Sequence, residues 1–198
     1  MIMCLLTSQQ RSGPNSPVGR FLLLQPFPIT FENISTTGDI KNFIKGILEE
    51  NNLKRYINKI SKFFTANYDN IEGNNWSIIE KLKVLKSSNS KEEERRIADD
   101  INDSFYGFGP KQSRNFLQAL GLTKYEIPID SRITNWLNKF GFPVLLNSSS
   151  LGDKSYYHFV LDGIQELCYK AEIYPCMLDA AIFSSYDNGE WTLENTRF

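Results

Sequence analysis

The sequence predicts an all-α protein, and three observations support this class. Apolar residues recur at helical spacing through most of the chain, as in the run from Ile40 to Leu48. Capping residues or proline stand where several of these runs begin, as expected at helix N-termini. No alternation of strands with helices is visible, which argues against a βαβ fold, and 198 residues suffice for one domain or two small lobes.

The first half of the chain is expected to contain several helices and one irregular segment. Residues 1–9 have the pattern of the end of a buried helix, and turn-forming residues follow at 11–17. The apolar segment 21–28 is interrupted by proline, so we expect it to be extended or irregular. The periodic runs that predict helices in this half lie at 40–48, 53–64 and 77–85.

The second half is also expected to be helical, apart from an extended segment at 125–129 that contains Pro128. Asp130 follows this segment and is a favourable N-cap for the next helix. The charged run at 92–96 is expected to be the solvated face of its helix. The helices expected in this half lie at 91–104, 111–120, 131–140, 156–173 and 175–184.

The composition argues against several classes of protein. The chain is 41% hydrophobic and 23% charged, and no apolar run reaches the roughly 18 residues that a membrane span needs. Its three cysteines, Cys4, Cys168 and Cys176, are too scattered for a disulfide framework and too few for a four-cysteine iron–sulfur cluster. A single histidine, His158, argues against a zinc site. We therefore expect a cytoplasmic or otherwise intracellular protein without a metal or cofactor.

The charges are unevenly distributed along the chain. The net charge is −1, which by itself argues mildly against a nucleic-acid partner. Residues 105–140, however, contain five cations and two anions, whereas the rest of the chain contains 17 cations and 21 anions. A basic segment within an acidic chain is compatible with a polyanionic ligand, and ordinary scatter of surface charge is the alternative.

The most informative segment joins two of the expected helices and reads Gly107-Phe108-Gly109-Pro110-Lys111. Glycines on both sides of an apolar residue let the backbone approach a phosphate closely, and the next helix directs its first N–H groups at that phosphate. A phosphate-loop NTPase is excluded, because that motif needs Gly, Lys and Ser or Thr in succession. A plain corner between two helices with an exposed lysine is the alternative.

A second segment, Ile127-Pro128-Ile129-Asp130, follows, and Asp130 lies 19 positions after Lys111. An aspartate that caps a helix is common. The two segments together resemble the helix-hairpin-helix DNA glycosylase superfamily, which includes endonuclease III and the 8-oxoguanine DNA glycosylases. The resemblance implies an all-α fold of two helical lobes with a helix-hairpin-helix motif, in one glycosylase domain covering residues 1–198. The missing cluster cysteines favour the branches that lack an iron–sulfur cluster.

The resemblance also implies a DNA N-glycosylase that acts as a lyase at AP sites, because lysine at this hairpin position distinguishes members with both activities. Lys111 would attack the anomeric carbon of a damaged nucleotide, displace the base and form a Schiff base that leads to β-elimination. Asp130 would stabilise the positive charge that develops on the sugar and help to move protons. A lysine becomes nucleophilic where its surroundings disfavour the protonated amine, and neither role requires a metal or cofactor.

The same resemblance assigns residues to DNA binding. Gly107, Phe108 and Gly109 would form the backbone grip on the phosphates, with Arg114 as a further DNA-binding residue. Gln9, at the end of the first expected helix, matches the polar residue that fills the gap left by a flipped base. A polar helix C-terminus without that role is the alternative for Gln9.

Asp179 and Phe183 are implied to form the base pocket. They lie four residues apart, on one face of an expected helix. They match positions where the 8-oxoguanine branch has a glutamine that reads the base edge and an aromatic residue that stacks on the base. Aspartate in place of glutamine departs from that pattern, and an ordinary core role is the alternative for Phe183. The implied substrate is an oxidised purine, 8-oxoguanine, extruded from double-stranded DNA.

Two other functions stay open at this point. A non-catalytic helix-hairpin-helix DNA-binding module would use Lys111 only to contact phosphate. A glycosylase-like protein with incomplete architecture would be inactive, since the chain begins inside the family's first helix and its N-terminus is either truncated or atypical. The leading expectation is a monomeric enzyme of base-excision DNA repair that acts on double-stranded DNA with a damaged base. It is expected to be nucleoid-associated if it is prokaryotic, and no membrane partner is expected.

Overall fold

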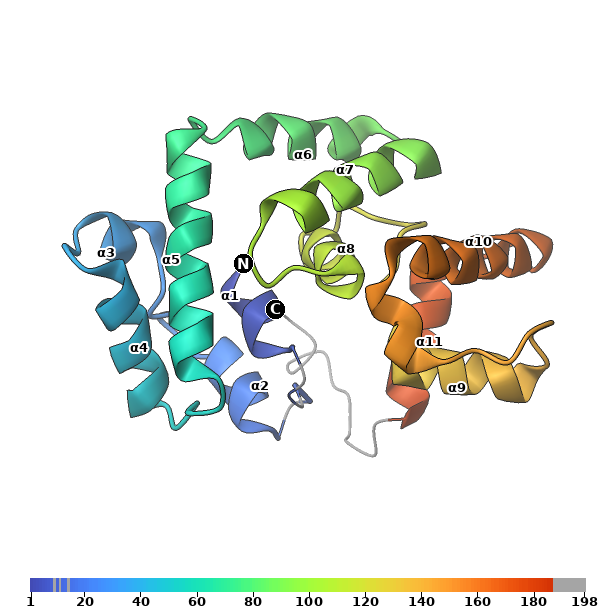
Figure 1. Cartoon of the computed structure of the whole chain (residues 1–198), viewed down its shortest axis with the longest axis horizontal. Helices are drawn as coiled ribbons and strands as arrows, with labels where there is room; N and C mark the ends of the chain where they lie inside the picture. The colour runs from blue at the N-terminus through green and yellow to red at the C-terminus, as the bar shows by residue number, and fades with distance from the viewer. Residues whose placement is uncertain (9, 11, 14, 187–198) are drawn as a thin grey trace. The chain divides into compact units, whose positions relative to one another are not determined.

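The computed structural model describes residues 1–8, 10, 12–13 and 15–186 (Figure 1). All regular secondary structure in these residues is helical, so the predicted all-α class is confirmed. None of the described helices has both the length and the apolar character needed to cross a membrane. The described residues form two compact units, the first at 1–76 and the second at 77–186.

Each unit is built from helices joined by short connections. In the first unit the helices are α1 (Ile2–Leu6), α2 (Pro17–Leu22), α3 (Phe31–Ser35), α4 (Ile40–Glu50) and α5 (Ile57–Gly73). In the second unit they are α6 (Ser77–Ser87), α7 (Lys91–Ser104), α8 (Pro110–Ala119), α9 (Ser131–Phe140), the 3-10 helix η1 (Ser148–Gly152), α10 (Lys154–Lys170) and α11 (Pro175–Tyr186).

The first unit is organised around α5, against which α1 and α4 both pack (Figure 1). Helix α4 begins where the sequence predicts, because the Asp39 carboxylate accepts the Asn42 N–H at 3.0 Å and caps the helix. Its buried residues, Ile44 and Leu48, lie four positions apart and therefore on one face. The apolar spacing of this run thus produces the expected amphipathic helix.

Three features of the first unit differ from the sequence prediction. Segment 21–28, predicted as irregular, overlaps α2, which starts at Pro17 with the Ser16 hydroxyl accepting the Gly19 N–H at 2.9 Å. The short helix α3, capped by Thr30, was not predicted, because it is too short to show a periodic pattern. Helix α5 begins later than expected, because Tyr56 has a left-handed backbone with φ of 58°.

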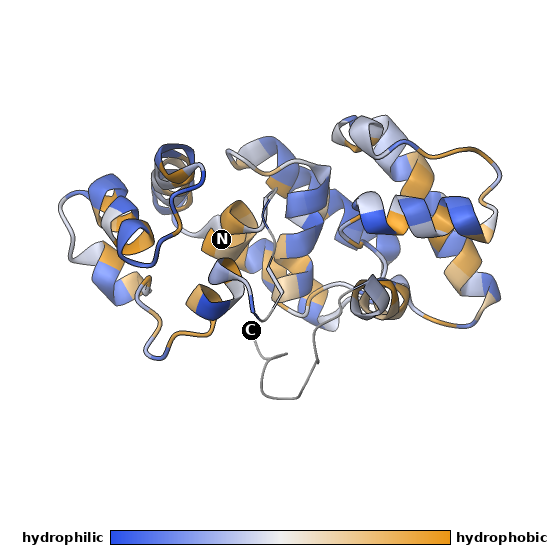
Figure 2. Cartoon of the chain, turned by 90° about the horizontal axis from the view of Figure 1, so that it is seen from below, coloured by the Kyte–Doolittle hydropathy of each residue, from blue (hydrophilic) through white to orange (hydrophobic). Residues whose placement is uncertain are grey.

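The second unit has a buried apolar core that α9, α10 and α11 share with the segment before α9. Ile127, Ile129, Ile133, Tyr157 and Ile164 belong to this core, and none of them is more than 2% exposed. In Figure 2, several helices have hydrophobic residues on one side and hydrophilic residues on the other. The core therefore fixes the segment that leads into Asp130 from several directions.

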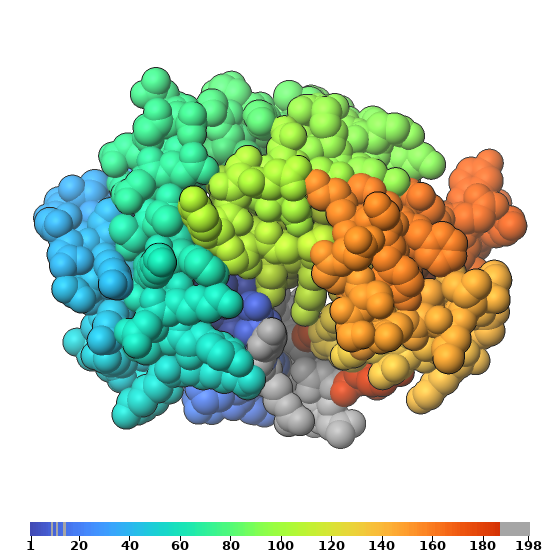
Figure 3. Space-filling view, viewed as in Figure 1, coloured from blue at the N-terminus to red at the C-terminus, as the bar shows by residue number. Residues whose placement is uncertain are grey.

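Helices α7 and α8 pack against each other and are joined by residues 105–109. Close to this connection, the Lys154 amine is 2.7 Å from the Asp103 carboxylate, which links the start of α10 to the end of α7, and α8 also contacts η1. Figure 3 shows these segments meeting at the surface, where the yellow-green of residues near 110 adjoins the orange of residues near 155. The α7–α8 pair is thus held by packing of α8 against η1 and by the ion pair to the start of α10.

Candidate active site

Lys111 stands in the first turn of α8, directly after the turn at residues 105–109. Gly109 is the N-cap and provides no side-chain hydrogen bond, and Pro110 occupies the first helical position. Gly107 has φ of 80°, a left-handed conformation that favours glycine, so this glycine is required by the backbone. Gly109 has an ordinary φ, and a Cβ there would meet no atom within 4 Å. The space beside Gly109 is therefore open to a ligand.

An aromatic cluster supports this turn from the inside. The rings of Phe105, Phe108 and Phe116 meet edge to face, with centroids 5.5 to 6.3 Å apart. Phe108 is only 4% exposed. A ligand at this turn would therefore contact backbone atoms, because the Phe108 side chain belongs to the core.

Asp130 uses its two carboxylate oxygens differently. Oδ1 caps α9 by accepting the N–H groups of Arg132 at 2.8 Å and Ile133 at 3.4 Å, as the sequence predicts. Oδ2 accepts the Arg132 Nε–H at 2.9 Å and lies 3.7 Å from the Lys111 amine. One oxygen thus serves the helix, and the other is held between two cations.

These contacts determine the ionisation of Asp130. Burial by itself would raise its pKa, but the hydrogen bonds and charge of Arg132, together with the charge of Lys111, outweigh burial and hold the pKa below its usual value. Asp130 is therefore a carboxylate at neutral pH. A fixed negative charge next to an amine is suited to stabilising a developing positive charge.

Asp179 and Phe183 lie on α11, which packs against α9. Gln118 of α8 donates a hydrogen bond to Asp179 Oδ2 at 2.7 Å, and the guanidinium carbon of Arg132 lies 4.2 Å from the centre of the Phe183 ring. Burial raises the pKa of Asp179 to about 6, the nearby charge of Asp130 adds to this effect, and Gln118, Arg132 and Lys111 oppose it. Helices α8, α9 and α11 therefore bring two acidic and two basic side chains and an aromatic ring together.

Two residues that make these contacts, Arg132 and Gln118, were not predicted from the sequence. Arg132 bonds to the carboxylate two residues before it, and an arginine in the first turn of a helix gives no distinctive signal. Gln118 stands seven positions after Lys111, two helical turns further along α8, so helical periodicity could have placed both on one face. We refer to Lys111, Asp130, Arg132, Asp179 and Phe183 below as the candidate site.

One predicted DNA contact is wrong. Arg114 is completely buried, and its guanidinium bonds Glu126 at 2.9 Å and Asp99 at 2.7 Å. A side chain with no exposed surface has nothing to offer a phosphate, so Arg114 is a buried structural cation. Gln9 lies outside the described residues, and its predicted role stays a prediction.

The charged run at 92–96 also differs from its predicted solvated state. Glu94 is 4% exposed, and its carboxylate accepts the N–H groups of Lys124, Tyr125 and Glu126. Arg95 is partly buried and lies 2.9 Å from the Glu126 carboxylate.

Among the described residues, no three His, Cys, Asp or Glu side chains are grouped as a metal site would require.

The chain is similar to one curated DNA repair protein. It is 28% identical over 106 residues to the 8-oxoguanine DNA glycosylase/AP lyase of Thermoplasma volcanium. The match covers 54% of this chain and 48% of the relative, so the chain spans about half the length of the curated relative it matches. No protein-family model matches the chain, and no solved structure matches it. The similarity supports a glycosylase-like relationship.

Proposed function

We propose that this protein is a DNA N-glycosylase with AP lyase activity, which removes an oxidised purine in base-excision repair. The observation that carries the proposal is the 3.7 Å separation between the Lys111 amine and the Asp130 carboxylate, with Lys111 at the start of a helix that follows a glycine-containing turn. The similarity to a glycosylase/lyase supports the same activity. Under this proposal the whole chain, 1–198, is one glycosylase domain that acts as a monomer.

The proposed reaction begins at the sugar of the damaged nucleotide. The unprotonated Lys111 amine attacks C1′, the bond from C1′ to the base breaks, and its electron pair leaves with the base, which takes up a proton. Positive charge develops on the sugar in the transition state, and the Asp130 carboxylate stabilises it. Opening of the sugar ring then gives an iminium between the Lys111 nitrogen and C1′. Loss of a C2′ proton to a base expels the 3′ phosphate and cleaves the strand.

The DNA is proposed to bind through the turn before α8. The backbone near Gly107 and Gly109 is suited to close approach by a phosphate, and the uncapped N-terminus of α8 presents N–H groups to an anion. Contacts of this kind position the duplex without reading its sequence. The damaged nucleotide would leave the base stack to reach Lys111, as in other enzymes that act on a base.

The base pocket is proposed to contain Asp179 and Phe183. An ionised carboxylate can accept two parallel N–H donors, and 8-oxoguanine offers such a pair at its ring N–H and exocyclic amine. The Phe183 ring, which Arg132 now covers, would stack on the base. We therefore propose 8-oxoguanine as the substrate.

The proposal is tested with duplex DNA containing a single 8-oxoguanine. The expected result is release of the base and, with borohydride present, a covalent protein–DNA adduct at a preformed abasic site. Undamaged duplex should give neither product. Binding of both duplexes without base release or adduct would make the protein a DNA-binding module and would contradict the proposal.

A further inference from the structure

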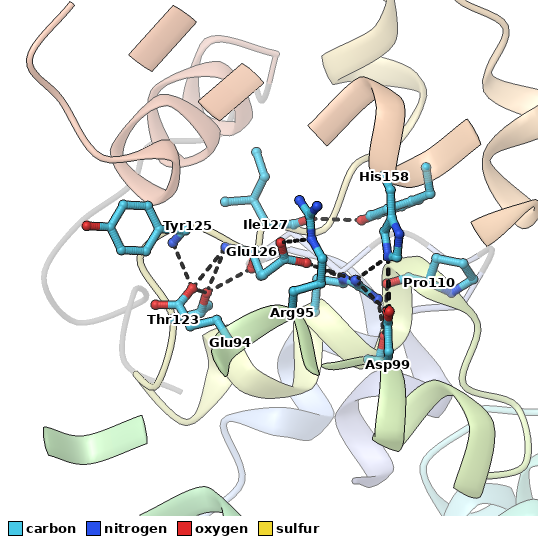
Figure 4. Close-up of polar contacts among 12 residues, drawn as sticks. Glu94, Arg95, Asp99, Pro110, Thr123, Tyr125, Glu126, Ile127 and His158 are labelled. Atoms are coloured by element: carbon cyan, nitrogen blue, oxygen red, sulfur yellow. Dashed lines mark hydrogen bonds and ion pairs between the residues drawn. The ribbon is translucent and has the colours of Figure 1, made fainter. Parts of the chain in front are cut away.

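A buried network of charged side chains ties α7 and α8 to the segment that leads into Asp130 (Figure 4). Glu126, which is completely buried, stands four residues before Asp130 and bonds Arg114 of α8 through Oε2 and Arg95 of α7 through Oε1, both at 2.9 Å. Arg114 extends the network to Asp99, which also lies 3.2 Å from the His158 ring. The network thus joins the helix of Lys111 to the segment of Asp130.

Tyr157 forms hydrogen bonds to the other part of that segment, residues 127–129. The hydroxyl of Tyr157, on α10, accepts the N–H of Ile129 at 2.7 Å and donates to the carbonyl oxygen of Ile127 at 2.8 Å. These two main-chain groups flank Pro128, which has no N–H of its own. A single oxygen atom therefore holds the backbone on both sides of Pro128, directly before Asp130.

The same tyrosine contacts the helix that carries Lys111. The guanidinium carbon of Arg114 lies 5.2 Å from the centre of the Tyr157 ring, and Arg114 stands three residues after Lys111 in α8. Tyr157 is completely buried. Its ring thus supports α8 while its hydroxyl supports the Asp130 segment, so it lies between the two halves of the candidate site.

We infer that Tyr157 is a positioning residue, which sets the place of the Asp130 carboxylate relative to the Lys111 amine. This inference rests on the proposed function, because it assigns Asp130 a part in base removal. Loss of the hydroxyl leaves the buried Ile127 carbonyl and Ile129 N–H without this partner, so the segment shifts or loosens. The carboxylate that follows it then no longer stands where charge develops on the sugar.

The test compares two tyrosines that are neighbours in α10. Tyr157→Phe removes the hydroxyl that holds the Asp130 segment. Tyr156→Phe removes a hydroxyl that accepts the Asn147 N–H at 2.7 Å, away from that segment, and is the matched control. Single-turnover excision of 8-oxoguanine should slow about tenfold in Tyr157→Phe and less than about twofold in Tyr156→Phe.

A second readout separates positioning from general damage to the fold. Borohydride trapping at a preformed abasic site requires the Lys111 amine but not the departure of a base. Tyr157→Phe should therefore keep trapping within about threefold of the wild-type protein while excision falls about tenfold. If Tyr157→Phe lost excision and trapping equally, the role of Tyr157 would be merely structural. If Tyr157→Phe kept the wild-type excision rate, Tyr157 would have no positioning role.

A second variant protects the test against poor folding of Tyr157→Phe. Pro128→Gly loosens the same segment without changing Tyr157 and should give the same split between excision and trapping. Retention of wild-type excision by Pro128→Gly would contradict the inference. If the wild-type protein itself releases no base, the proposed function fails. If the wild-type protein releases the base and the variants release it equally fast, only the inference about Tyr157 fails.

Discussion

The Lys111 amine lies 3.7 Å from Asp130 Oδ2, the same oxygen that accepts a hydrogen bond from the Arg132 guanidinium. Two cations therefore share one carboxylate oxygen, while the other oxygen caps α9. Arg132 also covers the ring of Phe183. A base could therefore stack on that face of the Phe183 ring only after Arg132 has moved away from it.

Replacing Asp130 by asparagine should impair base removal far more than folding. Asparagine is about as good an N-cap as aspartate, so the loss of stability should be about 1 kcal/mol or less, including the weakened ion pairs. Excision of 8-oxoguanine should fall about 100-fold or more, because the negative charge is lost. Excision rates and thermal melting measured on the same preparation check this. Intact catalysis with a collapsed melting temperature would leave Asp130 only its capping role.

Replacing Arg132 by alanine should raise the pKa of Asp130, because Arg132 makes the largest contribution among the contacts that lower it. A depressed carboxyl pKa supports activity at acidic pH, so the acidic limb of the excision rate should move to higher pH in Arg132→Ala. Lys139→Ala, at an exposed position of the same helix, is the control. An unshifted acidic limb in Arg132→Ala would show that the rate does not depend on the ionisation of Asp130.

Asp179 should make the fold less stable at neutral pH than at acidic pH. Its pKa is raised to about 6, so folding takes up a proton on this carboxyl between the unfolded value of 3.8 and about 6, and its contribution to stability declines as pH rises through that window. Asp179→Asn should therefore stabilise the protein by about 1–3 kcal/mol near pH 7.5 and by much less near pH 4. Urea unfolding at both pH values measures the difference, and equal effects at the two would contradict it.

The same residue should determine which base is removed. Asp179→Ala should lose the preference for 8-oxoguanine over thymine glycol as well as rate, because thymine glycol lacks the paired donors that a carboxylate accepts. The comparison uses duplexes that are identical except for the lesion. A wild-type preference for thymine glycol would exclude Asp179 from base recognition and leave Phe183 a core residue.

Replacing Arg114 by methionine should destabilise the protein by about 3–5 kcal/mol, because it leaves the buried Glu126 carboxylate without its main partner. The folded fraction should bind DNA with an unchanged dependence on salt, since Arg114 has no exposed surface. Denaturant unfolding and a salt titration of DNA binding test both points. A stable variant with a weaker salt dependence would restore Arg114 as a DNA contact.

The sequence predicts the helices of the second unit well because local signals agree there. Helices α7 and α9 have the predicted bounds, and α9 begins at the predicted cap, Asp130. Neither periodicity nor charge indicates that Lys111 and Asp130, 19 positions apart, lie close together, and only the resemblance to the glycosylase superfamily selects them as a pair. Their chemical roles stay predictions.

The buried network could not be predicted because its partners are distant in sequence. Glu94 looks like a surface residue within a charged run, and only the turn at 123–126 explains its burial. Arg114 stands in the basic segment 105–140 and is expected from the sequence to contact DNA, but in the structure Glu126 and Asp99 bond its guanidinium. A local pattern counts charges but does not show whether another element neutralises them.

Lys111 is the proposed nucleophile, and borohydride trapping tests this role most directly. The wild-type protein and Lys139→Gln, the matched control at an exposed lysine, should both form a covalent adduct with abasic-site DNA. Lys111→Gln should form none and should not cleave the strand, while its affinity for DNA stays within about threefold of the wild-type value. Undiminished trapping by Lys111→Gln would contradict the account.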